Sequence, residues 1–490
     1  MKSIVNTLNI EIKNTELIQV QSSISRGMTK FTISGNIDKE IREARNRIKS
    51  AFRYNSLKFP MGNLTINLSP ANIKKSGTSF DLPIAISILS NHYDFSDIDK
   101  YIICGEITLT GDLVSIKNPI RIVNESRKLG FNSVIIPKSD FKFSYLFDDI
   151  KICEANNLKE VINHLRGFKT IELNDDSIKE DERQTEFDIN DIIAQEGLIR
   201  ALIIAISGKH NILIKGPVGI GKTVSIKSIQ SIFPKLSHNK SIILSDILSR
   251  TRDENLLVEY PLLVYSNNNI NNRDLFGTNK NLGLITESNF GYMVFDEINT
   301  YSKSVLSNIK RILDNDDIYK FDKEKFIDYP VDFSVIATMN SCPCGKLGTN
   351  EKCNCTMSEI ERYNKKIDNA LLDRFHIKIL VDSPDKFYTA NKTYDIDKIK
   401  NDIERVNDVQ LKRYSDEFLN NGYLNSKEII EFFDLDENII QLLESISNKY
   451  KFSKRRMDNL LKVARTIADL DSKSKIEENH IYESLKYQDF

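Results

Sequence analysis

One motif in this chain of 490 residues restricts its possible folds more than any other feature. Gly216-Pro-Val-Gly-Ile-Gly-Lys-Thr223 follows an apolar run at 212–215 and precedes a segment with helical periodicity. A glycine-rich turn between a strand and a helix forms a phosphate-binding loop, in which backbone N–H groups surround the phosphates. We therefore expect ATP and Mg²⁺ at this loop, with Lys222 on the β- and γ-phosphates and the Thr223 hydroxyl on Mg²⁺. The residues predicted to contact the nucleotide are Gly216, Pro217, Val218, Gly219, Ile220, Gly221, Lys222 and Thr223.

Two later apolar runs end in polar residues that suit nucleotide hydrolysis. The run at 292–295 ends in Asp296 and Glu297, and the run at 333–338 leads to Asn340. We expect Asp296 to join Thr223 in the Mg²⁺ shell and Glu297 to orient and deprotonate the attacking water. Asn340 would position that water against the γ-phosphate. Taken alone, the acids could cap a buried strand and Asn340 could be a turn residue.

Three arginines are candidates for contact with the transferred phosphoryl group. Arg374, in the segment 369–375, would stabilise its charge from a neighbouring subunit; the alternative is a surface salt bridge. Arg455 and Arg465 lie in segments of C-terminal helical periodicity. Each would face the nucleotide or belong to a solvated basic face, and spacing alone does not decide between these alternatives.

Four of the six cysteines cluster in the pattern C-x-C-x8-C-x-C, at Cys342, Cys344, Cys353 and Cys355. Four thiolates around Zn²⁺ form a closed structural site with no open position for catalysis. We therefore predict a structural zinc that rigidifies the loop after Asn340. A reversible thiol–disulfide switch and unligated cysteines are the alternatives.

Composition excludes several classes of protein. The 68 Lys+Arg residues balance 69 Asp+Glu residues, so bulk charge cannot hold nucleic acid or an anionic membrane. A hydrophobic content of 40% is typical of globular chains. Residues 1–13 lack the apolar core of a signal peptide, and no apolar run is long enough to span a bilayer. We expect a cytoplasmic protein without a membrane partner.

The order of apolar and polar segments predicts an α/β protein with several domains. Strands at 31–34, 63–68 and 133–137 alternate with helices at 37–54 and 81–90, which indicates a mixed α/β domain over 1–168. Residues 169–187 read as an acidic linker, and an acidic contact surface is the alternative. An α/β nucleotide-binding core would occupy 188–390, with the cysteine pattern as an insert, and helices would fill 391–490.

Four blocks of sequence carry a resemblance to a known family. They are Lys-Lys-Ser-Gly-Thr-Ser-Phe-Asp-Leu-Pro-Ile-Ala at 74–85, Gly-Lys-His-Asn-Ile-Leu-Ile-Lys-Gly at 208–216, Met-Asn-Ser-Cys-Pro-Cys-Gly at 339–345, and Ser453-Lys-Arg455 with Val-Ala-Arg-Thr-Ile-Ala-Asp-Leu at 463–470. The chain resembles the magnesium-chelatase-like AAA+ ATPases of bacteria, in the branch that contains ComM and YifB.

The resemblance implies a fold, an assembly and an activity. It implies a Lon-protease-like N-terminal domain of the ChlI type, an AAA+ core, a helical C-terminal lid and hexameric rings. It makes 216–223 the Walker A motif, Asp296 and Glu297 the Walker B motif and Asn340 sensor 1. It also makes Arg374 an arginine finger acting in trans and Arg455 a sensor 2 arginine.

The implied activity is an ATP-driven branch-migration helicase that promotes DNA integration in natural transformation. The rival is a protein remodeller or chelatase-type motor that has no DNA substrate. A ring that binds ATP without sustained turnover is a further alternative, and Glu297 and Arg374 argue against it. The loop 317–325, with Lys320, Lys323 and Lys325, is the candidate DNA contact, although a solvated loop is the alternative.

Two sequence features depart from what the family and its fold suggest. Lon-type proteolysis needs a Ser–Lys dyad; Ser79 stands at the nucleophile position, but the base position falls on Ile122, beside Arg121. We therefore expect no protease activity. In place of the family's basic PFRxPHH stretch, the chain has Glu-Tyr-Pro-Leu-Leu-Val-Tyr at 259–265, followed by Arg273. That difference weakens the case for DNA contacts there.

Overall fold

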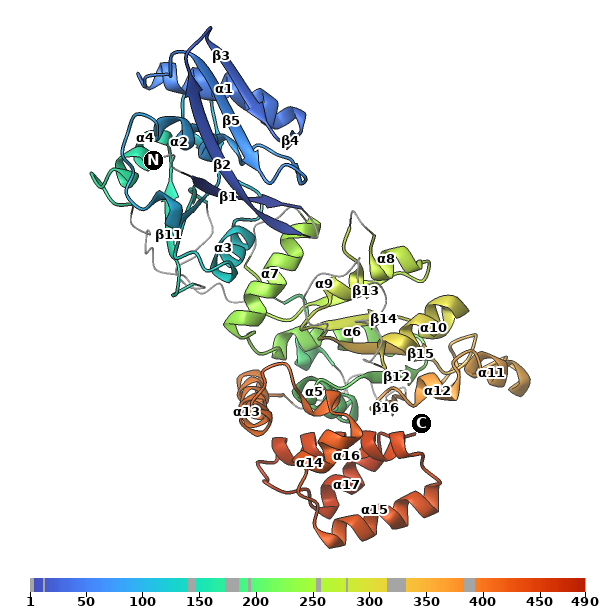
Figure 1. The fold of residues 1–490 in the computed structure, drawn as a ribbon. Helices are drawn as coiled ribbons and strands as arrows, with labels where there is room; N and C mark the ends of the chain where they lie inside the picture. Colours follow the sequence, from blue (N-terminus) through green and yellow to red (C-terminus); the bar gives the residue numbers. More distant parts are fainter. Residues whose placement is uncertain are drawn as a thin grey trace. The chain divides into compact units, whose positions relative to one another are not determined.

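The computed structural model describes residues 4–11, 14–139, 147–171, 185–192, 195–252, 257–278, 281–314, 332–382 and 393–489. The chain forms two compact units. The first consists of Met1–Glu180 and His238–Val258, and the second of Asp181–Ser237 and Glu259–Phe490 (Figure 1). Each unit has hydrophobic clusters of its own.

The first unit is built on a mixed seven-stranded sheet. Its strand order is β11-β10-β7-β1-β2-β5-β3. The pairs β1–β2 and β2–β5 are antiparallel, and the remaining neighbours run parallel. The strands are β1 (Val5–Ile10), β2 (Thr15–Ser25), β3 (Lys30–Ser34), β5 (Asn63–Ser69), β7 (Tyr101–Ile103), β10 (Ser133–Pro137) and β11 (Lys151–Ala155).

Helices and short strand pairs complete this unit. They are α1 (Lys39–Tyr54), α2 (Asp81–Leu89), α3 (Pro119–Lys128) and α4 (Leu158–Leu165), with the pairs β4 (Asn36–Ile37)–β6 (Lys74–Lys75) and β8 (Glu106–Ile107)–β9 (Leu113–Val114). The predicted start of the first helix at Ile37 is wrong. Ile37 pairs with Lys75, and the Asp38 carboxylate caps the helix by accepting from Ile41 N–H.

In the sequence, helix α7 (His238–Arg252) lies between two elements of the second unit, but it belongs to the first unit. Its Ile242 lies in the hydrophobic cluster that contains Leu8 and Ile102. Its Asp246 is fully buried, 3.9 Å from the Arg121 guanidinium, and is also paired with Arg250. A buried carboxylate needs such partners, so these ion pairs help to fix α7 in this unit.

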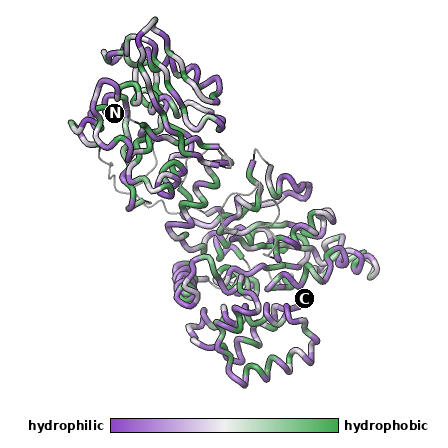
Figure 2. The backbone as a smooth tube through the Cα atoms, viewed as in Figure 1, coloured by the Kyte–Doolittle hydropathy of each residue, from purple (hydrophilic) through white to green (hydrophobic). Residues whose placement is uncertain are grey.

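The second unit contains a parallel five-stranded sheet of order β13-β14-β15-β12-β16. Its strands are β13 (Leu263–Ser266), β14 (Tyr292–Phe295), β15 (Ser334–Asn340), β12 (Ile212–Gly216) and β16 (Ile377–Leu380). The three central strands β14, β15 and β12 are mostly hydrophobic, as the backbone colouring in Figure 2 shows, because both faces of a parallel sheet are covered. Since parallel strands share a carboxyl edge, the residues that follow β12, β14 and β15 gather there.

Short helices connect these strands. They are η3 (Ile189–Asp191), α5 (Glu196–Gly208), α6 (Lys222–Ser228), η4 (Ile229–Ile232), α8 (Asn272–Phe276), α9 (Leu284–Glu287), η5 (Ile298–Thr300), α10 (Lys303–Ile312), α11 (Met357–Asn364) and α12 (Asn369–Leu372). This mixed α/β architecture with a parallel sheet fits an AAA+-like fold.

The C-terminal part of the second unit is helical. It contains α13 (Ile396–Tyr414), η7 (Asn421–Tyr423), α14 (Ser426–Phe432), α15 (Glu437–Tyr450), α16 (Lys454–Leu470) and α17 (Glu478–Leu485). Helix α16 packs against both α5 and α17, and every residue from Asn459 to Asp469 is buried. In the parts of the chain that the structure describes, no helix combines the length and apolarity that crossing a bilayer requires.

Candidate functional site: a phosphate-binding loop beside an acidic pair

The glycine-rich motif forms a tight turn between β12 and α6. Gly219 and Gly221 have φ values of +82° and +86°, a backbone conformation that favours glycine. A Cβ atom added to Gly216 would lie 2.5 Å from the carbonyl oxygen of Val381. Gly219 and Gly221 therefore form the bend, and Gly216 permits close packing against Val381. The Thr223 side chain lies exposed in the first turn of α6.

Lys222 points back into this turn. Its ammonium donates to the carbonyl oxygens of Gly216 and Pro217, both at 2.7 Å, and to Asn340 Oδ1 at 2.9 Å. Burial lowers the pKa of Lys222 to about 8, although the negative charges of Asp296 and Glu297 act in the opposite direction. The side chain is thus a buried cation whose three protons are all engaged.

The acidic pair lies at the end of β14, one strand away from β15. Asp296 Oδ1 accepts from the Thr338 hydroxyl at 2.5 Å, and the same hydroxyl oxygen accepts from Glu297 N–H at 2.8 Å. Glu297 has a φ of +50°, which is uncommon outside glycine. Asn340 Nδ2 donates to Glu297 Oε1 at 2.9 Å.

Asn340 therefore connects the two predicted halves of the site. Its Oδ1 accepts from Lys222 and its Nδ2 donates to Glu297, so one amide lies between the cation and the carboxylate. The Thr338 hydroxyl likewise holds Asp296, because it donates a hydrogen bond to that carboxylate. It was missed in the sequence, although its position two residues before Asn340 places both side chains on one face of β15.

Arg374 and Arg455 converge on a single carboxylate, that of Asp314 at the end of α10. Arg374 donates to Asp314, and Arg455 Nη2 donates to Asp314 Oδ1 at 2.7 Å. Burial acts to raise the pKa of Asp314, but the hydrogen bonds from both arginines lower it below its ordinary value. Among the described residues, no hydrogen bond or ion pair joins either arginine to Lys222 or Glu297. No sequence signal singled out Asp314.

The structure agrees with neither of the two alternatives for Arg465, contact with the nucleotide or a place on a solvated basic face. Its side chain is 3% exposed and is paired with Asp469, one turn later on α16, with 3.1 Å between Arg465 Nε and Asp469 Oδ1. It also donates to the carbonyl oxygens of Lys473 and Ser474. Arg413 binds the same carboxylate. Arg465 is therefore part of a buried ion-pair network among the C-terminal helices.

The four clustered cysteines meet in the loop between β15 and α11. Their Sγ atoms all lie within 4.8 Å of one another, with separations of 3.4 Å for Cys342–Cys344, 3.6 Å for Cys344–Cys353 and 3.7 Å for Cys342–Cys353. Four thiolates bound tetrahedrally to Zn²⁺ at about 2.3 Å would be about 3.8 Å apart. The cluster is therefore compatible with a structural metal such as zinc.

Hydrogen bonds shift the pKa values of these thiols in opposite directions: although a backbone hydrogen bond at Cys344 acts to lower the pKa of Cys355, the hydrogen bonds with the neighbouring thiols raise it to about 12. The backbone N–H of Lys346, followed by the neighbouring thiols, lowers the pKa of Cys344 to about 6. Leu347 N–H donates to Cys342 Sγ at 3.4 Å. Because metals bind thiolates and not thiols, a thiol that loses its proton near neutral pH suits this role.

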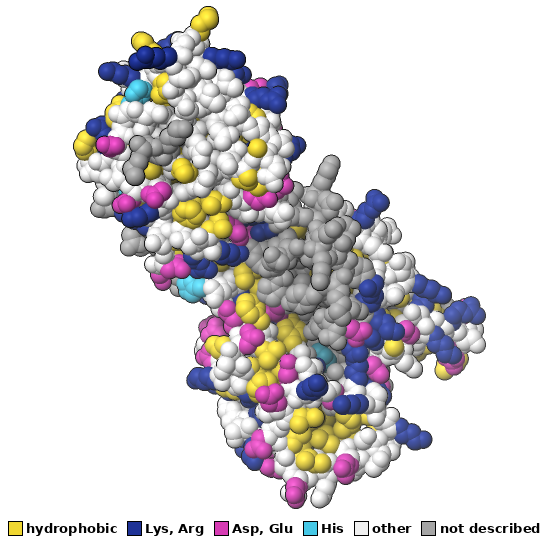
Figure 3. Space-filling view, viewed as in Figure 1, with side chains coloured by type: hydrophobic (Ala, Val, Ile, Leu, Met, Phe, Trp, Pro, Cys, Tyr) yellow, Lys and Arg dark blue, Asp and Glu magenta, His cyan; other side chains and the backbone are white. Residues whose placement is uncertain are grey.

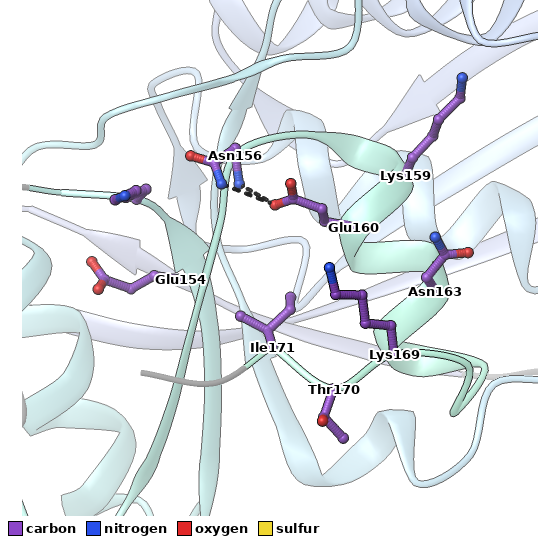
Figure 4. Close-up of a pocket in the computed structure, with 9 residues that line it drawn as sticks. Glu154, Asn156, Lys159, Glu160, Asn163, Lys169, Thr170 and Ile171 are labelled. Atoms are coloured by element: carbon purple, nitrogen blue, oxygen red, sulfur yellow. Dashed lines mark hydrogen bonds between the residues drawn. The ribbon is translucent and has the colours of Figure 1, made fainter. Parts of the chain in front are cut away.

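The first unit contains a separate polar pocket of about 540 Å³. Lys159 and Asn163 line it from α4, and Lys169 and Thr170 line it from the segment after α4 (Figure 4). Glu160, also in the lining, accepts from the backbone and side-chain N–H groups of Asn156 at 2.8 and 3.2 Å. Among the described residues, neither Lys159 nor Lys169 forms an ion pair, which leaves both ammonium groups available to an anion.

Three further features considered in the sequence analysis do not belong to the described site. The loop 317–325, with Lys320, Lys323 and Lys325, is outside the described residues. Ile122, at the position of a proteolytic base, is 1% exposed in the hydrophobic cluster under α3. Arg121 beside it is also 1% exposed and donates to the carbonyl oxygen of Glu11 at 2.5 Å.

The parallel sheet, the glycine-rich turn and the acidic pair at its carboxyl edge define a P-loop protein of the AAA+ type. Comparison with known families identifies residues 188–387 with magnesium chelatase, subunit ChlI, residues 20–140 with subunit ChlI of Mg-chelatase, and residues 395–488 with the C-terminal region of that subunit. The chain belongs to the magnesium-chelatase-like family, in the group that includes ComM and YifB.

Two relatives match over almost the whole chain, and a third matches about a fifth of it. The competence protein ComM of Haemophilus influenzae is 29% identical, covering 96% of this chain and 94% of its own length. YifB of Escherichia coli is 28% identical, covering 99% of this chain and 97% of its own. The DNA repair protein RadA of Streptococcus pneumoniae is 27% identical over 19% of this chain and 22% of its own.

Proposed function

We propose that this protein is an ATP-hydrolysing ring motor that acts on DNA, with branch migration during recombination of incoming DNA as its reaction. The hydrogen-bonded series Lys222–Asn340–Glu297 at the carboxyl edge of the parallel sheet supports the ATP-hydrolysing part of the proposal, and the names of the relatives support DNA as the substrate. In this proposal Lys222 leaves the loop carbonyls for the β- and γ-phosphates, and Glu297 orients and deprotonates the attacking water. Asn340 holds that water and the carboxylate in line with the γ-phosphate.

The residues present suit Mg²⁺. Thr223 and Asp296 offer a hydroxyl and a carboxylate, the hard oxygen ligands that this ion prefers. Asp296 Oδ1 is held by Thr338, whereas its Oδ2 accepts no hydrogen bond from the described residues. When bound, Mg²⁺ would neutralise charge on the phosphates. The role of this chain is to orient Asp296 through Thr338 before the ion arrives.

Arg374 and Arg455 are the proposed finger and sensor 2. Both lie on Asp314 in the isolated chain, and neither contacts the phosphate-binding loop in the described residues. We propose that Arg374 reaches the nucleotide of a neighbouring subunit, so that hydrolysis requires assembly, as a hexamer in the form the family implies. Asp314 would then hold both guanidinium groups in position until nucleotide competes for them.

The remaining parts receive the roles that the family suggests. We propose a Lon-like, ChlI-type domain without protease activity at 1–168, an acidic linker at 169–187, an AAA+ core at 188–390, whose helix α7 belongs to the first unit, and a helical lid at 391–490. The four-cysteine cluster would hold structural Zn²⁺. The names of two relatives, a competence protein and a DNA repair protein, support DNA as the substrate.

Local contacts, not bulk charge, must hold DNA in this proposal. On the face that Figure 3 displays, basic and acidic side chains are interspersed over each unit, in agreement with the net charge of −1. In the pocket beside α4, Lys159 and Lys169 form no ion pair with any residue that the structure describes, while Glu160 is already bound to N–H groups. We propose that DNA phosphates contact these two lysines.

A branch-migration assay tests the proposal. The protein is mixed with a labelled four-way junction, and the resolved duplexes are measured with ATP, without ATP, and with Glu297→Gln. We expect product only from the unchanged chain with ATP. If the chain hydrolyses ATP but leaves every junction intact, the DNA motor is wrong and a protein remodeller or chelatase-type motor takes its place.

A further inference from the structure

The cysteine loop, defined as residues 341–355, lies directly against the phosphate-binding loop. Val218 N–H donates to the carbonyl oxygen of Gly345 at 2.9 Å. Gly345 has a φ of +75°, and a Cβ atom added there would lie only 2.3 Å from Val218 Cγ2 and 2.9 Å from Val218 Cβ. Gly348 faces Pro217, the residue before Val218, and a Cβ atom added to Gly348 would lie 3.5 Å from Pro217 Cγ. Gly345 thus allows the cysteine loop to pack closely on Val218, and Gly348 lies at ordinary contact distance from Pro217.

The hydrogen bond from Val218 fixes the centre of the phosphate-binding loop. Val218 lies between Pro217, whose carbonyl oxygen accepts from Lys222, and Gly219, which has a positive φ. Its side chain is 57% exposed, so packing by its own neighbours does not hold it. Within the described residues, the hydrogen bond to Gly345 therefore restrains Val218 from outside the phosphate-binding loop.

The position of Gly345 depends in turn on the cysteines. Gly345 N–H donates to the carbonyl oxygen of Cys342 at 3.1 Å, and Leu347 N–H donates to the Cys342 sulfur. The chain thus wraps around Cys342, with Cys344 immediately before Gly345. A metal held by Cys342 and Cys344 from one side and by Cys353 and Cys355 from the other would lock this turn, and with it the Gly345 carbonyl.

We propose that the metal-bound cysteine loop holds the phosphate-binding loop in its nucleotide-binding shape, and that Gly345 and Val218 are the positioning residues that connect them. Occupancy of the four-cysteine site by Zn²⁺ then sets the affinity for ATP, although no cysteine contacts the nucleotide. This inference rests on the proposed nucleotide binding at the loop. It goes further by making nucleotide affinity depend on the metal.

The first test separates the contact from ordinary backbone strain. Gly345→Ala introduces both a positive-φ alanine and the clash with Val218, whereas Gly130→Ala introduces a comparable positive φ (+83°) with no atom within 4 Å. We expect Gly345→Ala to weaken binding of a fluorescent ATP analogue by about ten-fold or more, since a lost hydrogen bond and a displaced loop each contribute. Gly130→Ala should bind like the unchanged chain.

Further measurements on the same variants distinguish positioning from unfolding. Zinc content and the thermal transition of Gly345→Ala should match those of Gly130→Ala, and KM for ATP should rise more than kcat falls. If Gly345→Ala retains its zinc and binds the ATP analogue within about two-fold of the unchanged chain, the inference is wrong. If the unchanged chain binds no ATP analogue, the proposed function itself fails.

The second test varies the metal. A chelator should remove Zn²⁺ and weaken binding of the analogue, and added Zn²⁺ should restore it in the unchanged chain but not in Cys353→Ser. Cys104→Ser is the matched control, because Cys104 is buried in the first unit, far in sequence from the cluster. Equal affinity of the metal-loaded and metal-free chain would overturn the inference.

Discussion

A buried histidine pair should make the second unit sensitive to mild acid. His210, just before β12, is 0% exposed, and its Nε2 lies 2.7 Å from the Thr466 hydroxyl on α16. The His376 ring stands edge-on to it, with 5.3 Å between ring centroids. Burial lowers the pKa of His210 to about 3, and the nearby positive charge of Lys462 acts in the same direction. His210 is therefore neutral in the folded chain.

The lowered pKa of His210 determines the direction and the size of the change in folding stability with pH. Its ordinary value is 6.5, so between that value and about 3 the unfolded chain binds a proton that the folded chain does not. Stability is thus present above pH 6.5 and is lost as the pH falls below it. At about pH 5.5, one unit below the ordinary pKa, His210 costs about 1.4 kcal/mol of folding free energy relative to about pH 7.5.

The perturbation is His210→Asn, and the assay is calorimetric unfolding of both proteins at about pH 7.5 and about pH 5.5. The pH-dependent loss for the second unit should be smaller in the variant by about 1.4 kcal/mol. His376, whose pKa burial also lowers, contributes to both proteins. If both proteins lose the same stability over this interval, His210 does not remain neutral in the fold and the reasoning is refuted.

The other predictions concern catalysis and DNA. Glu297→Gln should keep ATP affinity but lose at least about 100-fold in steady-state phosphate release, because the base is gone; unchanged turnover would remove Glu297 from catalysis. Arg374→Ala should lose about 1000-fold in turnover while analogue binding stays nearly intact, and a loss of binding would instead assign Arg374 a structural role. Lys159→Glu with Lys169→Glu should weaken DNA binding and reduce its salt dependence by about two charges in a fluorescence titration, whereas Lys39→Glu, with its Glu43 partner, should change little. If the unchanged chain, the double lysine variant and Lys39→Glu bind DNA with equal salt dependence, the pocket is not a DNA contact.

The parts of the site that could be predicted are those with a local sequence signature. The turn at 216–223 needs glycine at fixed positions, and Asp296, Glu297 and Asn340 follow apolar strands whose order along the chain is evident. Thr338 could have been found from its two-residue spacing to Asn340. The four cysteines were predicted as a cluster because metal ligands in a loop lie close in sequence.

The parts that could not be predicted depend on contacts between distant segments. Asp314 is one acid at a helix end, and only the fold brings Arg374 and Arg455 to it. For Arg465 the sequence left contact with the nucleotide and a solvated basic face open, because the Arg413 that shares its Asp469 partner comes from α13.

Helix α7 shows the same limit at the level of domains. Its sequence position between α6 and β13 suggests the nucleotide-binding core, yet α7 belongs to the first unit, where Asp246 pairs with Arg121. The hydrogen bond between Val218 and Gly345 likewise joins residues more than a hundred positions apart. No motif marks such contacts, because any backbone N–H and carbonyl can form them.

The proposed function couples ATP hydrolysis by this chain to DNA. That coupling is tested by the steady-state ATPase rate without DNA, with single strands and with a four-way junction, at moderate salt. We expect turnover that depends on Glu297 and rises strongly with the four-way junction. Turnover that is the same with every DNA would contradict the coupling, and the absence of turnover under all conditions would contradict the ATPase itself.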